Sequence, residues 1–307
     1  MKKTKRNHSP ITIKEIAMKN ILVALDLTDI DETVIRYAHF MKEHLKLSKV
    51  HFVHNIKLND VDEVIQELLA GKNIKTIIQK NLTAKISKHF SNANEYTLTV
   101  LENDNTEYSL SNWAEQNAVG TILLGFKKED SGTAAMSQKL IRIFKGDVIL
   151  VPASAQLRWE RILVPTDLSG PFQLVHKKLD KLHNLDPQPD IRILKSFSIP
   201  SLFFPFIDDK QAIEQAREHI NKQYAEVKKK YAVSDNVSFV ARYQDEQSVV
   251  DVIKNESEKF RADLIMMTAK GASKIATIFI GSTINELINT DPFQAIFILK
   301  TTDPAAL

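Results

Sequence analysis

The feature that most constrains the fold of this chain is an internal duplication. The segment Ile21–Thr28, ILVALDLT, is restated by Ile162–Ser169, ILVPTDLS, which places Asp26 and Asp167 at matching positions. A second pair of matching segments, ILLG and IMMT, follows later in the two halves. Solenoid repeats are roughly 20–50 residues long, whereas this period is about 140 residues. The duplication therefore predicts two domains of the same fold in tandem.

Each half alternates short apolar strands with longer amphipathic helices. Strands that are apolar along their whole length indicate a parallel sheet with helices on both faces. We therefore expect an α/β protein made of two tandem, doubly wound, five-stranded parallel sheets of Rossmann-like type, with right-handed crossovers. The expected strands are 20–25, 49–54, 96–101, 121–124 and 148–151, then one that starts at 161, followed by 191–195, 237–243, 264–267 and 295–299. The expected helices are 31–47, 61–90 with a break near Gly71, 107–117, 135–144, 171–183, 209–231, 248–260 and 282–289, with 126–133 as a polar loop.

The same pattern sets the expected domain boundaries. The N-terminal segment is polar and basic and precedes the first strand, so we expect it to be disordered or loosely attached. Met18 stands just before that strand and is a candidate for the natural start. The expected division is an extension at 1–17, a first domain at 18–152, a linker at 153–158, a second domain at 159–301 and a tail at 302–307.

Composition excludes several functional classes. The chain has no cysteine, which excludes disulfides, thiol catalysis and thiolate metal sites. No apolar run approaches the ~20 residues that span a membrane, and the basic N-terminus is not followed by the apolar segment of a secretory signal. A net charge of +3 is a weak basis for nucleic-acid binding. We therefore expect a cytoplasmic protein with no membrane and no nucleic-acid partner.

The stretch Ile265–Thr283 is the strongest candidate for a site. An apolar strand ends in a small-residue loop, and a second glycine then opens an amphipathic helix. The chain has 8 glycines, where average usage of about 7% would give roughly 21, and Gly271 and Gly281 both stand at strand–helix junctions. Glycine lets the backbone approach a ligand, and a helix start presents unpaired N–H groups to an anion. The pattern fits a phosphate-binding loop, and two ordinary turns are the alternative.

With these residues in place, the chain resembles the universal stress protein family in its tandem form. The resemblance rests on the two duplicated opening strands, on five-strand halves of this length, and on Gly271 separated by nine residues from Gly281 and Ser282. It covers about residues 18–301. It implies a fold like that of adenine-nucleotide hydrolases, with ATP or AMP, accompanied by Mg²⁺, as the ligand. It also implies an intramolecular pseudo-dimer, in which strands 148–151 and 295–299 pair edge to edge and antiparallel.

ATP-binding members of that family follow the fourth strand with Gly, two residues, Gly, nine residues, and then Gly with Ser or Thr. The second half of this chain keeps the pattern except for Thr268, which replaces the first glycine. The first half keeps Gly125, but Lys128 replaces the second glycine and Ala134 stands in the place of the third, after a shorter loop. The resemblance therefore implies a nucleotide in the second half only. The implied cofactor-binding residues are Asp167, Thr268, Gly271, Gly281, Ser282 and Thr283.

The implied roles divide these residues between the two ends of a nucleotide. Asp167 would lie near the adenosine and Gly271 beside the phosphates, while Ser282 and Thr283 would hydrogen-bond phosphate oxygens. Thr268 stands where the family has its first glycine. If that position needs a positive φ, threonine there would strain the backbone. A β-carbon at either later glycine would push the phosphates away or strain the turn.

Other chemistry-bearing residues have simpler interpretations. Asp26 and Asp167 could be catalytic bases, but a carboxylate that caps the loop before the next helix is the favoured interpretation for Asp26, and both interpretations remain open for Asp167. His51 and His54 are three apart on a strand and point to opposite faces, so they predict no metal site. We find no nucleophile elbow, Walker motif or catalytic triad and expect no catalytic residue. Slow ATP hydrolysis would need a water-activating group that the sequence does not identify.

Two functional hypotheses remain open from the sequence. The first is a stress-response protein that binds an adenine nucleotide in its second half and has a regulatory or protective role. The second is a scaffold that binds no nucleotide and acts on a protein partner of unknown identity through its surfaces. The apolar stretch Ile199–Ile207 either covers its own core or forms a partner-binding or lipid-contacting flap. A homo-oligomer is compatible with both hypotheses.

Overall fold

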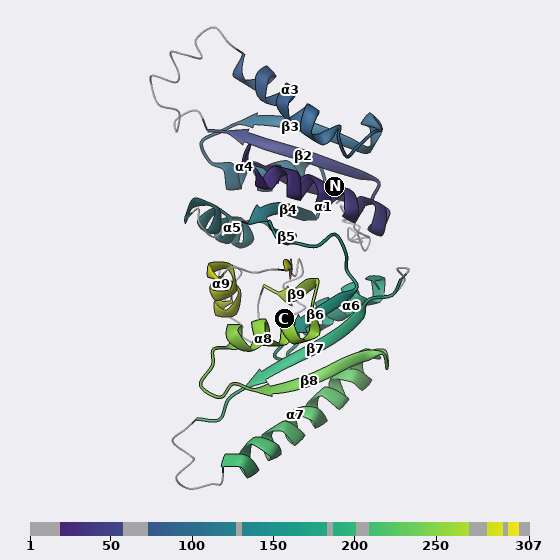
Figure 1. Cartoon of the computed structure of the whole chain (residues 1–307), viewed down its shortest axis with the longest axis vertical. Coiled ribbons are helices and arrows are strands. Elements are labelled where there is room, and N and C mark those ends of the chain that lie inside the picture. The colour runs from purple at the N-terminus through teal and green to yellow at the C-terminus, as the bar shows by residue number, and fades with distance from the viewer. Residues whose placement is uncertain are drawn as a thin grey trace, which may run out of the picture.

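The two halves of the chain share one continuous ten-stranded sheet (Figure 1). The computed structural model describes residues 19–57, 73–126, 131–182, 187–200, 209–269, 281–290 and 294–300. The first half supplies β1 (Asn20–Leu25), β2 (Lys49–Ile56), β3 (Tyr96–Glu102), β4 (Thr121–Phe126) and β5 (Asp147–Pro152). The second half supplies β6 (Arg161–Pro165), β7 (Asp190–Phe197), β8 (Val237–Tyr243), β9 (Leu264–Thr268) and β10 (Ala295–Leu299).

The strand order is β3-β2-β1-β4-β5-β10-β9-β6-β7-β8, so both halves have the same internal order. Neighbouring strands within each half are parallel. In each half the chain first builds outward from its opening strand and then returns to that strand's other side. This return creates a switch point between β1 and β4, and another between β6 and β9. The prediction of two tandem, doubly wound parallel sheets is confirmed.

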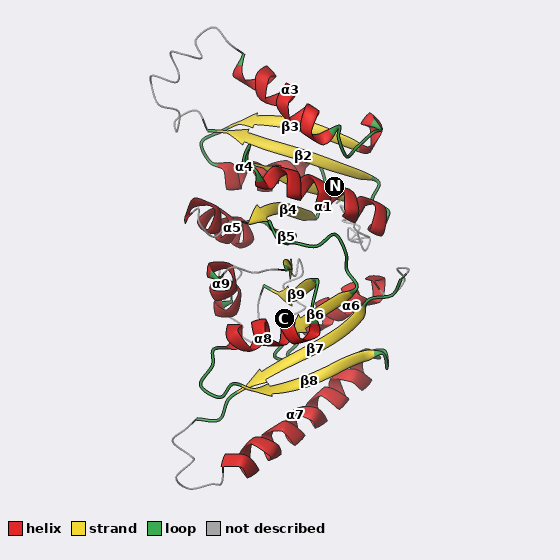
Figure 2. Cartoon of the chain, in the orientation of Figure 1, coloured by secondary structure: helices red, strands yellow, loops and turns green. Residues whose placement is uncertain are grey.

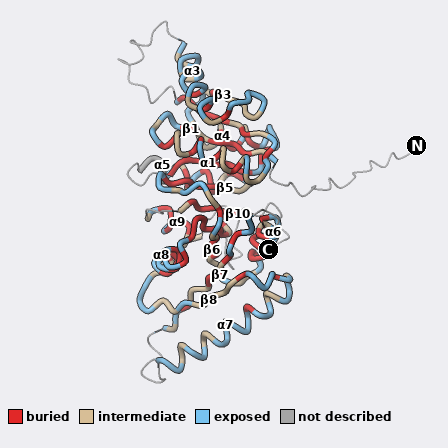
Figure 3. Tube along the Cα trace, turned by 45° about the vertical axis from the view of Figure 1, so that its right-hand side comes forward, coloured by how far each residue is buried: buried red, intermediate tan, exposed pale blue. Residues whose placement is uncertain are grey.

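Helices cover both faces of the sheet (Figure 2). Successive side chains of a strand point to opposite faces, so Ile21 and Val23 of β1 join one core while Leu22 joins the other. Each core runs through both halves, and Figure 3 shows the buried segments as a continuous band along the sheet. The first core is covered by α1 (Ile30–Leu45), α3 (Ile74–Ile86), α6 (Phe172–Leu182) and α7 (Asp209–Tyr231). The second is covered by α4 (Thr106–Gln116), α5 (Ser131–Ile143), α8 (Val249–Phe260) and α9 (Ser282–Asn289).

The last strands of the two halves join the sheet. β5 and β10 pair antiparallel, with Ile149 opposite Phe297 and the flanking residues in register. Both strands are buried along nearly their whole length, as expected for strands between two helical layers. The antiparallel pairing implied by the family resemblance is therefore present, and it removes two open sheet edges that would otherwise pair with other chains.

Several predicted element boundaries are corrected by the structure. α5 begins at Ser131 rather than at 135, so the end of the predicted loop 126–133 is helical and Ala134 lies in the first turn of α5 instead of preceding it. β2 continues to Ile56, beyond the predicted end at 54. In contrast, the predicted bounds of β1, β8, β10, α7 and α9 agree with those observed.

Some predictions lie outside the described residues. These are the extension 1–17, the tail 302–307, Lys128, Gly271, and most of the stretch Ile199–Ile207, of which only 199 and 200 are described. Among the residues that are described, no helix is both long enough and apolar enough to cross a membrane.

Candidate functional site

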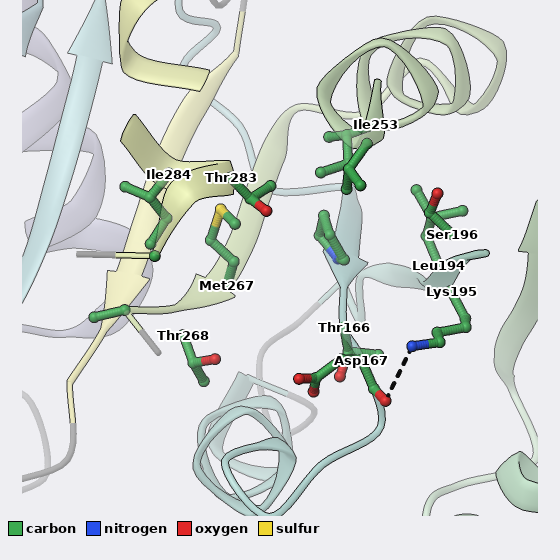
Figure 4. A pocket seen from close by; sticks show the side chains of 14 residues that line it. Thr166, Asp167, Leu194, Lys195, Ser196, Ile253, Met267, Thr268, Thr283 and Ile284 are labelled. Atoms are coloured by element: carbon green, nitrogen blue, oxygen red, sulfur yellow. Dashed lines mark hydrogen bonds between the residues drawn. The ribbon is translucent and has the colours of Figure 1, made fainter. Parts of the chain in front are cut away.

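A cavity of about 250 Å³ opens at the carboxyl ends of β6, β7 and β9 (Figure 4). It lies at the switch point between β6 and β9, which is where open α/β sheets bind their ligands. Its lining comes from the ends of these strands and from the helices α8 and α9. The cavity is lined by Pro165, Thr166, Asp167, Leu194, Lys195, Ser196, Val249, Ile253, Met267, Thr268, Ala269, Gly281, Thr283 and Ile284.

Asp167 closes a tight turn at the end of β6. Its Oδ1 accepts the backbone N–H of Ser169 at 2.9 Å, and Leu168 between them has a φ of 63°. The backbone carbonyl oxygen of Asp167 accepts a hydrogen bond from Lys195 Nζ at 3.2 Å, drawn as a dashed line in Figure 4. The turn thus places a carboxylate and an ammonium group together at one side of the cavity.

The first half contains the same turn. Asp26 Oδ1 accepts the backbone N–H of Thr28 at 3.0 Å, and Leu27 has a φ of 66°. The expectation that Asp26 caps the loop before the next helix is therefore confirmed. The N-cap of α1 is Asp29, and the carboxylate of Asp26 holds the turn that precedes it.

Thr268 ends β9 as a regular strand residue, paired with Leu299 of β10. It is not among the non-glycine residues with positive φ, so threonine in place of the family's first glycine carries no backbone strain here. Gly281 has a φ of −56°, which any residue can adopt. Its N–H donates to the carbonyl oxygen of Ala269 at 3.1 Å, so the end of β9 and the start of α9 lie together beside the cavity.

The N-terminus of α9 faces this cavity. Gly281 is its N-cap, and the backbone N–H groups of Ser282 and Thr283 form no hydrogen bond with any residue that the structure describes. The first N–H groups of a helix lack an internal partner and carry a partial positive charge, so they favour an anion. Figure 4 shows Thr283 on the side of the cavity opposite Lys195 and Ser196.

The structure brings together four of the six predicted cofactor-binding residues. Asp167, Thr268, Gly281 and Thr283 line the one cavity. Ser282 is exposed and is not part of the lining, although its backbone is adjacent. Gly271 belongs to the residues that the structure does not describe.

Sequence reasoning missed three polar residues of the lining: Thr166, Lys195 and Ser196. Lys195 was predicted as the last residue of a strand, and Ser196 as lying beyond it. Both lie within β7, whose carboxyl end adjoins that of β6. The sequence signal that could have identified Lys195 as a site residue was its position at the carboxyl end of a strand in a predicted parallel sheet.

The first half has a matching cavity of about 430 Å³ at the carboxyl ends of β1, β2 and β4. The strand registers put His54 at the position of Lys195 and Asn55 at that of Ser196. Gly125 occupies the position of Thr268, but its role is packing. A Cβ at Gly125 would lie 2.7 Å from both Cγ1 and Cγ2 of Ile30, so a side chain there would collide with α1.

A buried carboxyl group supports the opening turn of the first half. The two oxygens of Asp31 accept the backbone N–H groups of Asp26 and Leu27, each at 3.0 Å. Burial raises the pKa of Asp31 to about 6, partly offset by the hydrogen bond from Asp26 and by Lys85, whose ammonium is 3.7 Å away. Phe172 stands at the corresponding position of the second half, so this support belongs to the first half alone.

Comparisons with known proteins agree with this architecture. Residues 158–292 match the model of the universal stress protein family. A functionally unknown protein from Pseudomonas aeruginosa PAO1 has a similar solved structure, with a TM-score of 0.65 at 12% identity over 94% of this chain and 95% of that chain. A universal stress protein from Archaeoglobus fulgidus DSM 4304 gives a TM-score of 0.57 at 14% identity, over 92% and 96% of the two chains. No curated protein sequence matches the chain.

The fold, the duplicated turns and the position of the cavities define a tandem α/β protein of the Rossmann-like class. The second half of the chain matches the universal stress protein family by sequence, and the first half repeats the same strand order.

Proposed function

We propose that the second half binds an adenine nucleotide, ATP or AMP, in the cavity at the ends of β6, β7 and β9. The observation that carries the proposal is that one cavity has polar side chains on one side and the first N–H groups of a helix on the opposite side. Lys195 and Asp167 stand on one side, and the unpartnered N–H groups at the start of α9 stand on the other. An elongated ligand with a polar ring system at one end and phosphates at the other fits this arrangement.

The two sides have distinct tasks in this proposal. The adenosine lies against Asp167, Lys195 and Ser196, which offer a carboxylate acceptor and two donors for the ribose and the base. The phosphates lie at the start of α9, where the Thr283 hydroxyl joins the backbone N–H groups as a donor. Mg²⁺ accompanies ATP as the counter-ion of its phosphates.

A regulatory or protective role in the cytoplasm follows from nucleotide binding rather than from catalysis in this proposal. The bound nucleotide biases a conformation or a protein partner. We expect a dissociation constant between micromolar and millimolar, which corresponds to about −4 to −8 kcal/mol.

Calorimetric titration of the full chain with ATP and AMP, each with and without Mg²⁺, tests the proposal. Lys195→Met removes the donor on the adenosine side and should weaken ATP and AMP alike, by about tenfold, since a hydrogen bond to a charged group contributes about 1.5–3 kcal/mol. Thr283→Val removes a phosphate donor without changing the side-chain shape and should weaken ATP more than AMP.

Lys75→Met is the matched control. Lys75 pairs with the carboxylate of Glu102 at 3.1 Å, but it lies on α3 in the first half and is exposed. Its loss should leave nucleotide affinity unchanged. Absence of binding to the unaltered chain, or equal affinity in the unaltered chain and both cavity variants, would leave the scaffold hypothesis in place.

A further inference from the structure

The cavity of the first half differs in chemistry from its counterpart in the second half. It lies between the carboxyl ends of β1, β2 and β4 and the helices α3 and α4, outside residues 158–292. Most of its wall is aliphatic, with Leu25, Ile30, Ile56, Ile74, Ile78 and Leu110 among its lining residues.

Matching positions in the two halves show how the apolar wall arises. Leu25 stands where the second half has Thr166, and each of the two lines its own cavity. Leu27 and Leu168 share a positive φ, but Leu168 is partly buried against the core whereas Leu27 is 39% exposed and lines the cavity. The two halves therefore share a strand order, but the first-half cavity has apolar side chains at these positions.

Exposed apolar side chains gather on the same elements. Of four large hydrophobic side chains exposed in the described part of the chain, Leu27 lines the cavity, and Ile77 and Tyr108 belong to helices that wall it. Ile77 lies on α3 between the lining residues Ile74 and Ile78. Exposed apolar surface around a cavity is typical of a binding site.

The wall also contains hydrogen-bond acceptors that receive no donor from the described residues. His54 is buried, and its Nδ1 lies 2.8 Å from the carbonyl oxygen of Leu25. A carbonyl oxygen only accepts, so Nδ1 carries the proton. Burial lowers the pKa of His54, which keeps the ring neutral and leaves Nε2 as an acceptor. Nε2 forms no hydrogen bond with the described residues.

Asn55, the next residue on β2, adds a second acceptor. Its amide nitrogen donates to the carbonyl oxygen of Asn103 at 2.7 Å and to Thr106 Oγ1 at 2.9 Å, which fixes the orientation of the amide. Its Oδ1 is buried without a partner in the described structure. Among the described lining residues, Asp26 is the one carboxylate and Lys57 the one ammonium, so their formal charges balance.

We propose that the first-half cavity binds an uncharged, largely apolar small molecule that donates one N–H or O–H to Nε2 of His54. The aliphatic wall takes the body of the ligand, and the unpartnered acceptors on β2 select for a donor. The two halves of the chain then serve different ligands, and this second site does not depend on nucleotide binding in the other half.

N-phenyl-1-naphthylamine is a suitable probe, because it is uncharged, fluoresces in apolar surroundings and has a single N–H donor. We expect a saturable fluorescence increase with one site per full-length chain, which excess ATP does not reverse. In competition, 1-phenylnaphthalene, in which the same phenyl and naphthyl groups are joined directly and no donor is present, should bind about tenfold more weakly. His54→Phe should abolish that preference while retaining binding, provided that its circular dichroism spectrum is unchanged.

A matched pair of variants locates the probe. Ile74 is the first residue of α3 and lines the first-half cavity, and Val249 is the first residue of α8 and lines the second-half cavity. A glutamate is favourable in the first turn of a helix, so neither substitution should unfold the chain. Ile74→Glu should weaken the probe at least tenfold, and Val249→Glu should leave it unchanged. The reverse pattern, displacement by ATP, or the absence of saturable binding would overturn the proposal.

Discussion

The indole Nε1 of Trp159 donates a hydrogen bond to the phenolic oxygen of Tyr37 over 2.6 Å, across the boundary between the two halves. Both side chains are buried, Tyr37 in α1 and Trp159 just before β6. The Trp159 ring also contacts Phe40 of α1 and Phe297 of β10. The segment that connects the halves is therefore part of a shared core, and the halves should unfold together.

We expect Tyr37→Phe to destabilise the protein by about 1–3 kcal/mol, because the buried Trp159 N–H loses the one acceptor that it has among the described residues. Urea unfolding followed by tryptophan fluorescence and by circular dichroism measures the change. Tyr108→Phe is the control, since Tyr108 is half exposed, and its loss should change stability by less than about 0.5 kcal/mol.

The double variant with Trp159→Phe gives the coupling between the two residues. Removing both partners should cost less than the sum of the single changes, since no orphaned donor remains. Strictly additive costs, or two separate unfolding transitions in the unaltered chain, would contradict the shared core.

The fold was largely predictable from the sequence because the strands are short apolar runs between polar turns. Where the boundaries were wrong, tertiary contacts had overridden local preference. Asn55 interrupts the apolar pattern of β2, but its amide nitrogen donates to Asn103 and Thr106, and the strand continues to Ile56. The first turn of α5 contains Ser131, Gly132 and Thr133, which are weak helix formers and therefore favoured the prediction of a loop.

The raised pKa of Asp31 predicts a decline in stability with rising pH. A carboxyl group whose pKa is higher in the folded chain binds more protons when folded, between its unfolded and folded values. The stability contributed by protonated Asp31 is thus complete below about pH 4 and is lost as pH rises through about 6, where burial has moved its pKa. The shift corresponds to roughly 3 kcal/mol.

Urea midpoints measured between pH 4 and pH 7 check this prediction. In Asp31→Asn the group no longer titrates, so the decline across this window should be smaller than in the unaltered chain. Asp29→Asn is the control, because Asp29 is exposed and its side chain caps nothing. Parallel pH profiles for the unaltered chain and Asp31→Asn would rule out Asp31 as the cause.

Glu256 should act in the opposite direction. Burial alone would raise its pKa, but hydrogen bonds from Arg242 at 2.7 Å and Arg192 at 2.8 Å hold the pKa of Glu256 below its ordinary value. A depressed pKa contributes stability that is present above the unfolded value, near 4, and is lost as pH falls through the lower folded value. Glu256→Gln should cost about 2 kcal/mol at pH 7, because two charge-assisted hydrogen bonds are weakened.

The same measurement distinguishes Glu256 from Asp31. The cost of Glu256→Gln should shrink below pH 4, whereas the effect of Asp31→Asn is confined to the window above it. Glu258→Gln, on the exposed side of the same helix, should change neither the midpoint nor its pH dependence. A cost of Glu256→Gln that is constant from pH 3 to pH 7 would show that its charge contributes nothing.

The candidate site was less predictable than the fold. Asp167 and Thr283 were found from the duplicated turn and the helix start, which are local features of the sequence. Lys195 and Thr166 line the same cavity only because β6, β7 and β9 are neighbours, and this strand order is set by long-range pairing. The contrast between the two cavities likewise depends on which side chains meet at the switch points, and no local pattern reveals it.

Gly125 and Gly281 should respond differently to alanine, although both belong to the family's glycine pattern. At Gly281 the backbone has φ −56°, and among the described residues the nearest atom to an added Cβ is the Ala269 oxygen at 3.5 Å, so Gly281→Ala should change stability by less than about 0.5 kcal/mol. At Gly125 the added Cβ would collide with Ile30 on α1, and we expect Gly125→Ala to cost about 1–3 kcal/mol.

The collision itself can be tested by removing the side chain that Gly125→Ala would meet. Ile30→Ala deletes both Cγ atoms, so the double variant with Gly125→Ala should be more stable than the sum of the single effects predicts. Gly281→Ala, by contrast, should weaken ATP in the calorimetric titration while its urea midpoint stays that of the unaltered chain, because only the approach of phosphate to the backbone has changed. A Gly281→Ala variant that loses stability but not affinity would assign Gly281 to the turn and not to the ligand.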